Sequence, residues 1–397
     1  MEGTAISELI ISIGLGGMGI VGSPNIFHPT LSCSNALVTD SGVKTLVQWR
    51  NPRVIEIGIM SKELELKLGC LPTVAAKVCA LPFLSDLQSE SKLLLNLYYD
   101  TPDESLKRMK MALRIRKSGD QWLQTLKTTG TTDASGLSTR GEYEWVIDGP
   151  NLKLDLLSEL LPSEVESDTL YPVFSTNFKR TTWLYQCERT QIEIACDQGE
   201  VRTGNRIEPI SEVELELKQG EASAVFDLAE QLAGLSPFWI GQRSKAQRGW
   251  ELRFEHPPAP ELPSLIMERG DLVERIERLS AMTICWQRCY ELIPITLAPT
   301  VITTLCSALE QQIALLRQLT ELKPAVGLQK EYEALLMRVM PLYDLAYFSG
   351  SSPTFYKTIQ ERSRSVSAEL LNDPSIGQLA LRTAHFIRET IQGASDE

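Results

Sequence analysis

Two short segments carry acidic residues at every second position, a pattern that can present carboxylates to a metal ion. The first, ELELK at residues 63–67, lies near the front of the chain, and the second, EVELE at residues 212–216, lies far behind it. In a β-strand successive side chains point to opposite faces, so each segment has one charged and one apolar face. Same-face carboxylates about 7 Å apart repel by roughly 2.4 kcal/mol per pair at an effective dielectric constant near 20. An enclosed face of this kind therefore needs a cation.

Basic residues repeat the alternation in the strands between these two segments. Arg114 and Arg116 share one face of the segment MALRIRK, and Lys127 lies opposite Leu126. Exposed strands with solvated charged faces would explain each segment alone, because antiparallel sheets often have one face in water. Several strands of this kind instead favour a sheet curled around a polar lumen, with its apolar side covered from outside. Such a lumen suits a highly charged ligand.

Length, charge and cysteine content limit the classes of protein to which the chain can belong. At 397 residues and 43% hydrophobic content, the chain is long enough for two domains with sizeable cores. Its formal charge of −12 argues against a nucleic-acid binder that relies on general positive charge. The eight cysteines form no CxxC pair and no histidine-containing cluster with zinc spacing, so we expect reduced thiols in a cytoplasmic protein.

The N-terminal segment differs from the rest of the chain. Its apolar stretch at residues 9–22 is shorter than a membrane span and no Lys or Arg precedes it, so neither a span nor a secretory signal is expected. The stretch contains GxGxxG, but Ser23-Pro24 and Pro29 interrupt the helix that a dinucleotide site needs. Because the first charged strand follows Met60 closely, we expect residues 1–59 to be a flexible tail or a mis-assigned upstream extension.

The remaining chain divides into a strand-rich part and a helical part. Residues 92–218 read mainly as strands separated by turn-rich stretches, with a predicted helix at residues 152–160. Further helices are predicted at residues 71–87, with a proline interruption, and at residues 221–234. The sequence HPPAP opens a linker at residues 256–263, and residues 264–397 show helical apolar spacing. These patterns predict an α+β protein, with a barrel at residues 60–255 followed by an all-α bundle at residues 264–397.

Several segments, in order, carry a resemblance to a known family. They are KELELKL, LNLYYDTPDESL, MALRIRK, LQTLKTTG, RGEY, FSTNFKRTTW, QIEIACDQGEV, EPISEVELEL and SKAQRGW. From about residue 61 to residue 252 the chain resembles the CYTH, or triphosphate tunnel metalloenzyme, family, whose signature is ExExK. It is most similar to bacterial inorganic triphosphatases that carry a CHAD-type helical domain behind the CYTH domain. The resemblance implies an eight-stranded antiparallel β-barrel tunnel with flanking helices, in which Mg²⁺ or Mn²⁺ assists hydrolysis of a terminal phosphoanhydride.

The resemblance also implies roles for individual residues. The metal-binding carboxylates would be Glu63, Glu65, Glu142, Asp197, Glu212, Glu214 and Glu216, with Glu212 nearer the tunnel mouth. The substrate-binding cations would be Lys67, Arg114, Arg116, Lys127, Arg140, Arg180, Lys245 and Arg248. The catalytic set would be Glu63, Glu65, Lys67, Lys127 and Lys245. No side-chain nucleophile is required, because a metal-oriented water can attack the terminal phosphorus with a tunnel glutamate as general base.

The C-terminal helical region occupies the CHAD position but departs from that pattern. CHAD domains typically show a histidine with neighbouring arginines on a helix, and here only the sequence HFIR at residues 385–388 gives a short likeness. We therefore expect a degenerate or shortened CHAD-like bundle. Its expected role is to pack on the barrel or to mediate a homodimer.

Three functions remain open on the sequence alone. The favoured one is metal-dependent hydrolysis of inorganic triphosphate, or of short polyphosphate, to pyrophosphate and phosphate. The same tunnel could act on nucleoside or thiamine triphosphates, or cyclise ATP as a class IV-type adenylate cyclase, although no aromatic pocket for a base is evident. The third function is non-catalytic binding of polyphosphate. The extra carboxylates would not add to the affinity of such a protein for its ligand unless a metal ion were bound. No nucleic-acid or membrane partner is expected.

Overall fold

The computed structural model describes residues 37–39, 42–44, 64–132, 138–254, 257–264, 270–347 and 353–395. Two short paired strands, β1 (Leu37–Thr39) and β2 (Gly42–Lys44), are the described part of the N-terminal segment. The expectation that residues 1–59 form a tail or extension otherwise lies outside the described residues. Glu63 lies outside them too.

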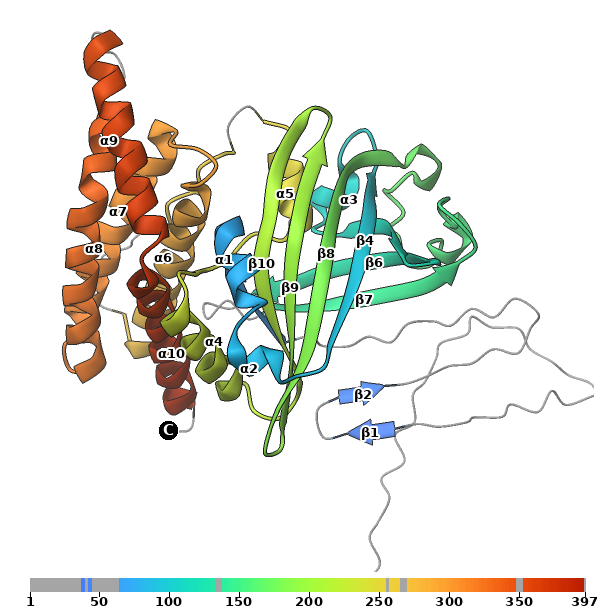
Figure 1. The fold of residues 1–397 in the computed structure, drawn as a ribbon, viewed down its shortest axis with the longest axis horizontal. Helices are drawn as coiled ribbons and strands as arrows, with labels where there is room; N and C mark the ends of the chain where they lie inside the picture. Colours follow the sequence, from blue (N-terminus) through green and yellow to red (C-terminus); the bar gives the residue numbers. More distant parts are fainter. Residues whose placement is uncertain are drawn as a thin grey trace, which may run out of the picture. The chain divides into compact units, whose positions relative to one another are not determined.

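Eight antiparallel strands form a closed barrel (Figure 1). They are β3 (Leu64–Gly69), β4 (Ser89–Asp100), β5 (Ala112–Ser118), β6 (Gln121–Thr132), β7 (Ser138–Ile147), β8 (Tyr171–Cys187), β9 (Thr190–Thr203) and β10 (Arg206–Gln219). Their order is β10-β9-β8-β4-β5-β6-β7-β3, and pairing of β10 with β3 closes the circle. The two-residue strand β11 (Trp239–Ile240) adds to the end of β3. The predicted eight-stranded antiparallel barrel is confirmed.

The apolar faces of β3, β9 and β10 point outward and are covered by helices. Leu66 and Leu215 are completely buried in a core that includes residues of α1 (Pro72–Val78) and α4 (Ser223–Leu235). The helix predicted at residues 71–87 is divided at Pro82, as its proline interruption implied, so that α1 is followed by the short α2 (Pro82–Ser85). Figure 1 shows α1 and α4 on the outside of this wall of the barrel. The charged faces of these strands therefore line the lumen.

The opposite wall is covered by an irregular segment where a helix was predicted. The helix expected at residues 152–160 is wrong, because only a 3₁₀ turn (Leu154–Leu156) forms there. The side chain of Gln124 pairs with the backbone of Lys153, accepting from its N–H at 2.8 Å and donating to its carbonyl at 3.1 Å. Those backbone groups are therefore bonded to the barrel. Leu157 and Val165 pack instead against Leu126 of the outer wall.

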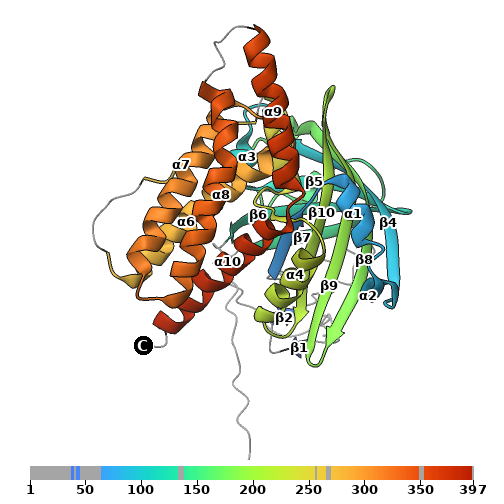
Figure 2. The ribbon, with the colours of Figure 1, turned by 60° about the vertical axis from the view of Figure 1, so that its left-hand side comes forward.

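A helical region follows the barrel. It consists of α6 (Leu272–Leu292), α7 (Pro299–Leu316), α8 (Lys323–Tyr347), α9 (Pro353–Leu371) and α10 (Pro374–Ser395). Its apolar core is continuous with the core outside β3 and β10. Figure 2 shows α10 beside α4, and the two helices are in contact. The part of the chain described by the structure has no helix with the length and hydropathy of a membrane span.

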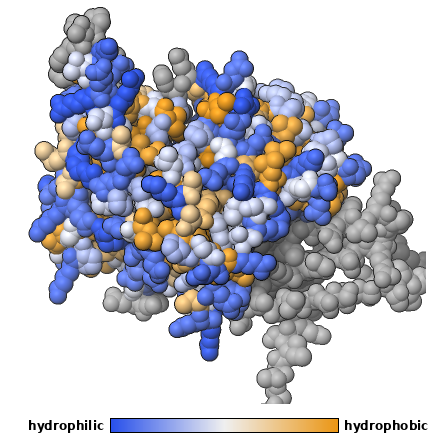
Figure 3. Space-filling model, viewed as in Figure 1, coloured by the Kyte–Doolittle hydropathy of each residue, from blue (hydrophilic) through white to orange (hydrophobic). Residues whose placement is uncertain are grey.

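The exposed surface mixes residue types. On the face drawn in Figure 3, hydrophobic residues are interspersed with hydrophilic ones. Leu93, Leu95 and Leu97 of β4 are partly exposed on the outer face of the barrel, with Leu93 60% exposed. The helices that cover β3 and β10 do not extend over this strand.

Candidate active site in the barrel lumen

Strand register brings the sequence-predicted charges together in the lumen. Glu214 of β10 lies directly opposite Lys67 of β3, and Asp197 of β9 lies opposite Glu212. Arg180 of β8 in turn lies opposite Asp197. Directly opposed residues point to the same face of a sheet. The alternation read from the sequence therefore places these side chains on one inner wall.

Three of these carboxylates form a cluster that can hold a cation. Ligand oxygens of Asp197, Glu212 and Glu214 lie within 4.8 Å of one another. The ammonium Nζ of Lys245 lies 2.6 Å from Asp197 and 3.0 Å from Glu214, and also contacts Glu212. Arg180 binds Asp197 through two hydrogen bonds of 2.8 and 2.7 Å and also contacts Glu214. The acidic cluster, defined here as Asp197, Glu212 and Glu214, is thus neutralised by side-chain cations.

These contacts keep both signs of charge ionised in the interior. Burial opposes ionisation of Glu214, but Lys245, Arg180 and Lys67 outweigh it and hold the pKa of that carboxyl well below its usual range. Burial likewise opposes protonation of Lys245, while the three carboxylates raise its pKa above the ordinary value. This inner wall therefore consists of ion-paired side chains. A bound metal ion or anion would compete for those ion pairs.

A short helix positions Lys245 against the acidic cluster. Helix α5 (Lys245–Glu251) begins where the Ser244 side chain accepts from the N–H of Gln247 at 3.1 Å, an N-cap bond. Trp250 of the helix packs edge-on to Phe174 of the barrel, with ring centroids 5.6 Å apart. A Cβ on Gly249 would lie 2.2 Å from Phe174, so only glycine allows this approach. Helix α5 therefore packs closely on the barrel and presents its first residue to the acids.

The facing wall of the lumen is basic. Arg114 is buried, with Nη2 3.4 Å from Glu142, and Lys127 lies 3.0 Å from the same carboxylate. Arg116 instead donates from Nε to the amide oxygen of Asn96 at 2.9 Å. Among the described residues no carboxylate forms an ion pair with Arg116. The guanidinium of Arg116 is thus held in place by a neutral amide, with the charge of Glu144 acting on it only from beyond ion-pair distance.

The pKa of Arg116 reflects that position. Burial and the neighbouring guanidinium groups of Arg114 and Arg180 lower it to about 10. The side chain still carries its charge at neutral pH, but at a free-energy cost that an anion would relieve. A bound phosphate would therefore stabilise the charged form of Arg116.

Other predicted site residues lie further from the cluster. Glu65 contacts Lys67 at 3.8 Å, and its side chain is 28% exposed. Glu216 pairs with Lys218 at 2.7 Å, and its side chain is 24% exposed. Glu212, expected nearer the mouth, is only 3% exposed and belongs to the acidic cluster. The structure gives the backbone of Arg140, in β7, and its side chain lies outside the described atoms.

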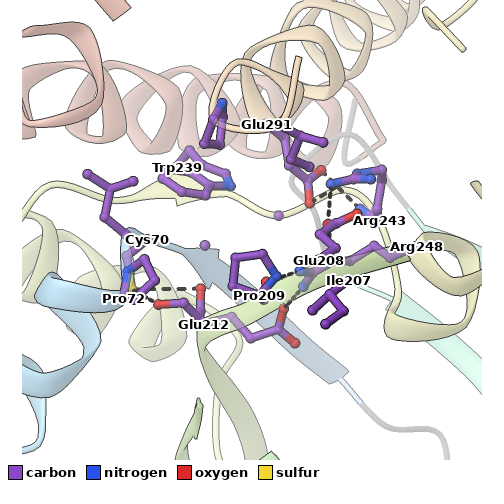
Figure 4. Close-up of a pocket in the computed structure, with 16 residues that line it drawn as sticks. Cys70, Pro72, Ile207, Glu208, Pro209, Glu212, Trp239, Arg243, Arg248 and Glu291 are labelled. Carbon is purple, nitrogen blue, oxygen red and sulfur yellow. Dashed lines mark hydrogen bonds and ion pairs between the residues drawn. The ribbon is translucent and has the colours of Figure 1, made fainter. Parts of the chain in front are cut away.

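Sequence reasoning missed a second set of buried charges behind α5, made of Glu208, Arg243, Glu251 and Glu291. Arg248 joins this set to the acidic cluster, because it donates to Glu208 at 2.6 Å and to Glu212 at 3.1 Å. Figure 4 shows Glu208, Arg243, Arg248 and Glu291 beside a cavity of about 240 Å³ that Trp239 also lines. Glu208 could have been found, since it lies on the same strand face as Glu212. Arg243 and Glu291 carry no comparable pattern.

Comparison with known proteins agrees with this geometry over the barrel. Residues 61–250 match the CYTH domain family. This part of the chain is a CYTH domain. A curated inorganic triphosphatase of Haemophilus influenzae is 40% identical over 197 residues, which are 49% of this chain and 56% of that protein. The chain thus covers little more than half of that relative's length.

Two solved structures also resemble the CYTH domain. One is a Hippeastrum protein reported to have a dominant triphosphatase activity, with 19% identity, a TM-score of 0.39, and coverage of 47% of this chain and 95% of its own. The other is the PH1819 protein of Pyrococcus horikoshii, with 20% identity, a TM-score of 0.33, and coverage of 48% and 98%. The CYTH match ends before the helical region, whose CHAD-like character stays a prediction.

Proposed function

We propose that the CYTH domain hydrolyses inorganic triphosphate to pyrophosphate and phosphate, with Mg²⁺ or Mn²⁺ bound in the lumen. The observation that carries the proposal is the division of one lumen into an acidic cluster and a basic wall that includes Arg114 and Arg116. A linear polyanion with a bound divalent cation is complementary to both. The similarity to the Haemophilus influenzae inorganic triphosphatase supports the choice of substrate.

The acidic cluster fits a hard divalent cation. Its three carboxylates supply oxygen ligands, and Mg²⁺ and Mn²⁺ prefer such ligands together with waters and phosphate oxygens. In the structure the Lys245 ammonium makes the contacts that such a cation would compete for. We propose Glu65 and Glu142 as further carboxylates of the site, since each faces the lumen next to a lysine. A metal bound there would orient a water and neutralise charge on the leaving pyrophosphate.

The basic residues have the complementary task of holding the phosphates. Arg114 and Arg116 offer planar donor pairs to phosphate oxygens, and Lys67 and Lys127 supply compact charges. Arg180 lies between the two walls, since it binds the acidic cluster and lowers the pKa of Arg116. Holding the chain from several directions places the terminal phosphorus in line for attack by water, with a lumen carboxylate accepting the proton. This arrangement needs no covalent intermediate.

Phosphate release tests the proposal directly. Wild-type protein is given tripolyphosphate, ATP and thiamine triphosphate in parallel, each with Mg²⁺, Mn²⁺ or EDTA. We expect the highest kcat/KM for tripolyphosphate and no release in EDTA. A preference for ATP or thiamine triphosphate would replace the proposed substrate. Inactivity on all three with metal, together with tight tripolyphosphate binding, would leave the lumen as a binding site only.

Arg116→Ala is expected to raise KM for tripolyphosphate about 10- to 100-fold, with a smaller change in kcat. The reason is that a charge-assisted hydrogen bond contributes roughly 1.5–3 kcal/mol. Steady-state kinetics measure both constants. Arg202→Ala is the matched control, because Arg202 pairs with Glu200 and is 44% exposed, outside the acidic cluster. Equal KM values for Arg116→Ala and wild type would remove Arg116 from the substrate site.

A further inference from the structure

Helix α6, which lies outside the CYTH match, reaches the wall of the tunnel through buried charges. Glu291 Oε2 accepts hydrogen bonds from the backbone N–H groups of Gln242 and Arg243, at 3.1 and 3.2 Å. Its other oxygen lies 3.6 Å from Nε of Arg243. Glu291 is 6% exposed and Arg243 is 2% exposed, so this contact is shielded from water. A residue of the helical region therefore fixes the loop that immediately precedes α5.

From Arg243 the contacts continue without interruption to the acidic cluster. Arg243 donates to Glu208 at 2.9 Å and to Glu251, at the end of α5, at 3.0 Å. Glu208 accepts from Arg248, and Arg248 donates to Glu212. Glu212 contacts Lys245, which binds the remaining carboxylates of the cluster. Figure 4 shows Glu291, Arg243, Glu208 and Arg248 turned toward one another beside the cavity.

Buried charges of this kind hold their neighbours in one geometry. Arg243 forms ion pairs with three carboxylates, Glu208, Glu251 and Glu291. Removal of any one of these charges changes the position in which the guanidinium has its lowest electrostatic energy. A second link supports the same helix, since Arg288 of α6 donates to Glu251 at 3.2 Å. The loop before α5 and the last residue of α5 are therefore both bound to α6. The position of Lys245 against the acidic cluster depends on these bonds.

We propose that Glu291 is a positioning residue for the tunnel, through which the helical region sets the place of α5 and its Lys245. The proposal rests on the proposed triphosphatase function. It gives the helical region a part in turnover, in addition to covering the outer wall of the barrel. Substrate binding by Arg114, Arg116 and Lys127 lies on the other wall and does not depend on Glu291.

Glu291→Gln tests the proposal, because the amide keeps the size of the side chain and an acceptor for the two backbone N–H groups. We expect kcat on tripolyphosphate to fall about tenfold, since a displacement of about 1 Å in an active site can cost about 100-fold and the amide should shift α5 by less. KM should stay within twofold of the wild-type value. Glu291→Asp, which restores the charge at a shorter reach, should recover part of the loss.

Two measurements separate this effect from partial unfolding. Calorimetric titration with tripolyphosphate in EDTA counts binding-competent molecules, and the stoichiometry should match wild type. Arg275→Gln is the control, because Arg275 lies on the same helix and pairs with Glu321, away from the barrel. Wild-type kcat in folded Glu291→Gln would overturn the proposal while leaving the triphosphatase function intact. If wild-type protein itself fails to hydrolyse tripolyphosphate, the proposed function fails first.

A second, independent observation concerns two thiols on the outside of the barrel. Cys79 ends α1 and is half-buried, and Cys196 lies on the outer face of β9. Their Sγ atoms are 3.1 Å apart, about 1 Å more than a disulfide bond requires. The hydrogen bond with Cys196 is the largest cause that lowers the pKa of Cys79, to about 7, and the charge of Lys179 acts in the same direction. A low thiol pKa with partial exposure is typical of oxidisable cysteines.

We infer that Cys79 and Cys196 form a reversible disulfide when a peroxide is present. The Cys79 thiolate attacks one peroxide oxygen and becomes a sulfenic acid, releasing hydroxide that takes up a proton to give water. The Cys196 sulfur then attacks the Cys79 sulfur, and the sulfenic hydroxyl leaves as a second water. The two thiols together lose two electrons, which the peroxide gains. The bond would join α1 to the strand that carries Asp197.

Peptide mapping without reductant tests this site. After treatment of wild-type protein with hydrogen peroxide, we expect a peptide pair linked through Cys79 and Cys196 that separates on addition of dithiothreitol. Cys79→Ser should abolish the pair. Cys187→Ser is the control, because Cys187 is exposed on β8, and it should leave the pair unchanged. Oxidation of Cys187 in wild-type protein without any Cys79–Cys196 link would contradict the inference.

Discussion

Glu214→Gln is expected to lower metal-dependent tripolyphosphate hydrolysis about 100-fold or more, while the barrel stays folded. Glu214 is the carboxylate on which Lys245, Arg180 and Lys67 all converge. Glutamine keeps the size of the side chain but removes the charge that a divalent cation needs. The variant should also require higher Mg²⁺ or Mn²⁺ concentrations for half-maximal rate, because one of three clustered carboxylates is lost.

The kinetics of Glu214→Gln are compared with those of Glu200→Gln. Glu200 lies on β9 and is paired with Arg202, so its replacement should leave the rate unchanged. Circular dichroism of both variants shows whether the strands are retained. Full activity in Glu214→Gln at wild-type metal concentration would remove the acidic cluster from the proposed chemistry.

Lys245→Met is expected to make thermal stability strongly dependent on divalent metal. Without Lys245 the acidic cluster loses a buried cation, and breaking such a pair typically costs about 3–5 kcal/mol. A fall in Tm of several degrees should follow in EDTA. Mg²⁺ at about 100 times its Kd would return roughly 2.7 kcal/mol of stability. Differential scanning calorimetry measures both changes.

Wild-type protein should gain less from Mg²⁺ in the same experiment, because Lys245 competes for the carboxylates. Lys218→Met is the matched control, since Lys218 pairs with Glu216 outside the cluster and should show no added dependence on metal. If Mg²⁺ raises the Tm of wild type and Lys245→Met equally, the cation binds elsewhere. This readout does not require activity, so it tests the metal site separately from turnover.

Local periodicity predicted a sheet curled around a polar lumen, while the eight-stranded barrel and inner-wall residues such as Asp197 and Arg180 came from the family resemblance. Because a strand has a period of two, Lys67 and Glu214 were assigned to charged faces before their pairing across β3 and β10 was known. The same rule places Glu208 on the inner face with Glu212, but the apolar Ile210 lies between them, so Glu208 was not counted with the EVELE segment. Glu212 was expected nearer the mouth, but the period of one strand does not give the depth of a residue in a barrel, which depends on strand stagger.

Contacts that depend on tertiary packing could not be predicted. Arg243 meets Glu208 and Glu291 across sequence separations of 35 and 48 residues, and no periodic pattern links them. The apolar residues from Leu152 to Leu160 resemble a helix in sequence, yet the side chain of Gln124 bonds the backbone at Lys153 and the segment lies irregularly on the barrel. In both cases the deciding partner comes from a distant element.

Anomalous diffraction from a complex with Mn²⁺ and an imido analogue of triphosphate tests the central claim most directly. The claim is that one lumen holds a divalent cation and a chain of phosphates together. We expect an anomalous peak bonded to oxygens of Asp197, Glu212 or Glu214, with the phosphates against Arg114 and Arg116. Manganese and analogue bound on the outer surface, or in the cavity beside Trp239, would contradict it.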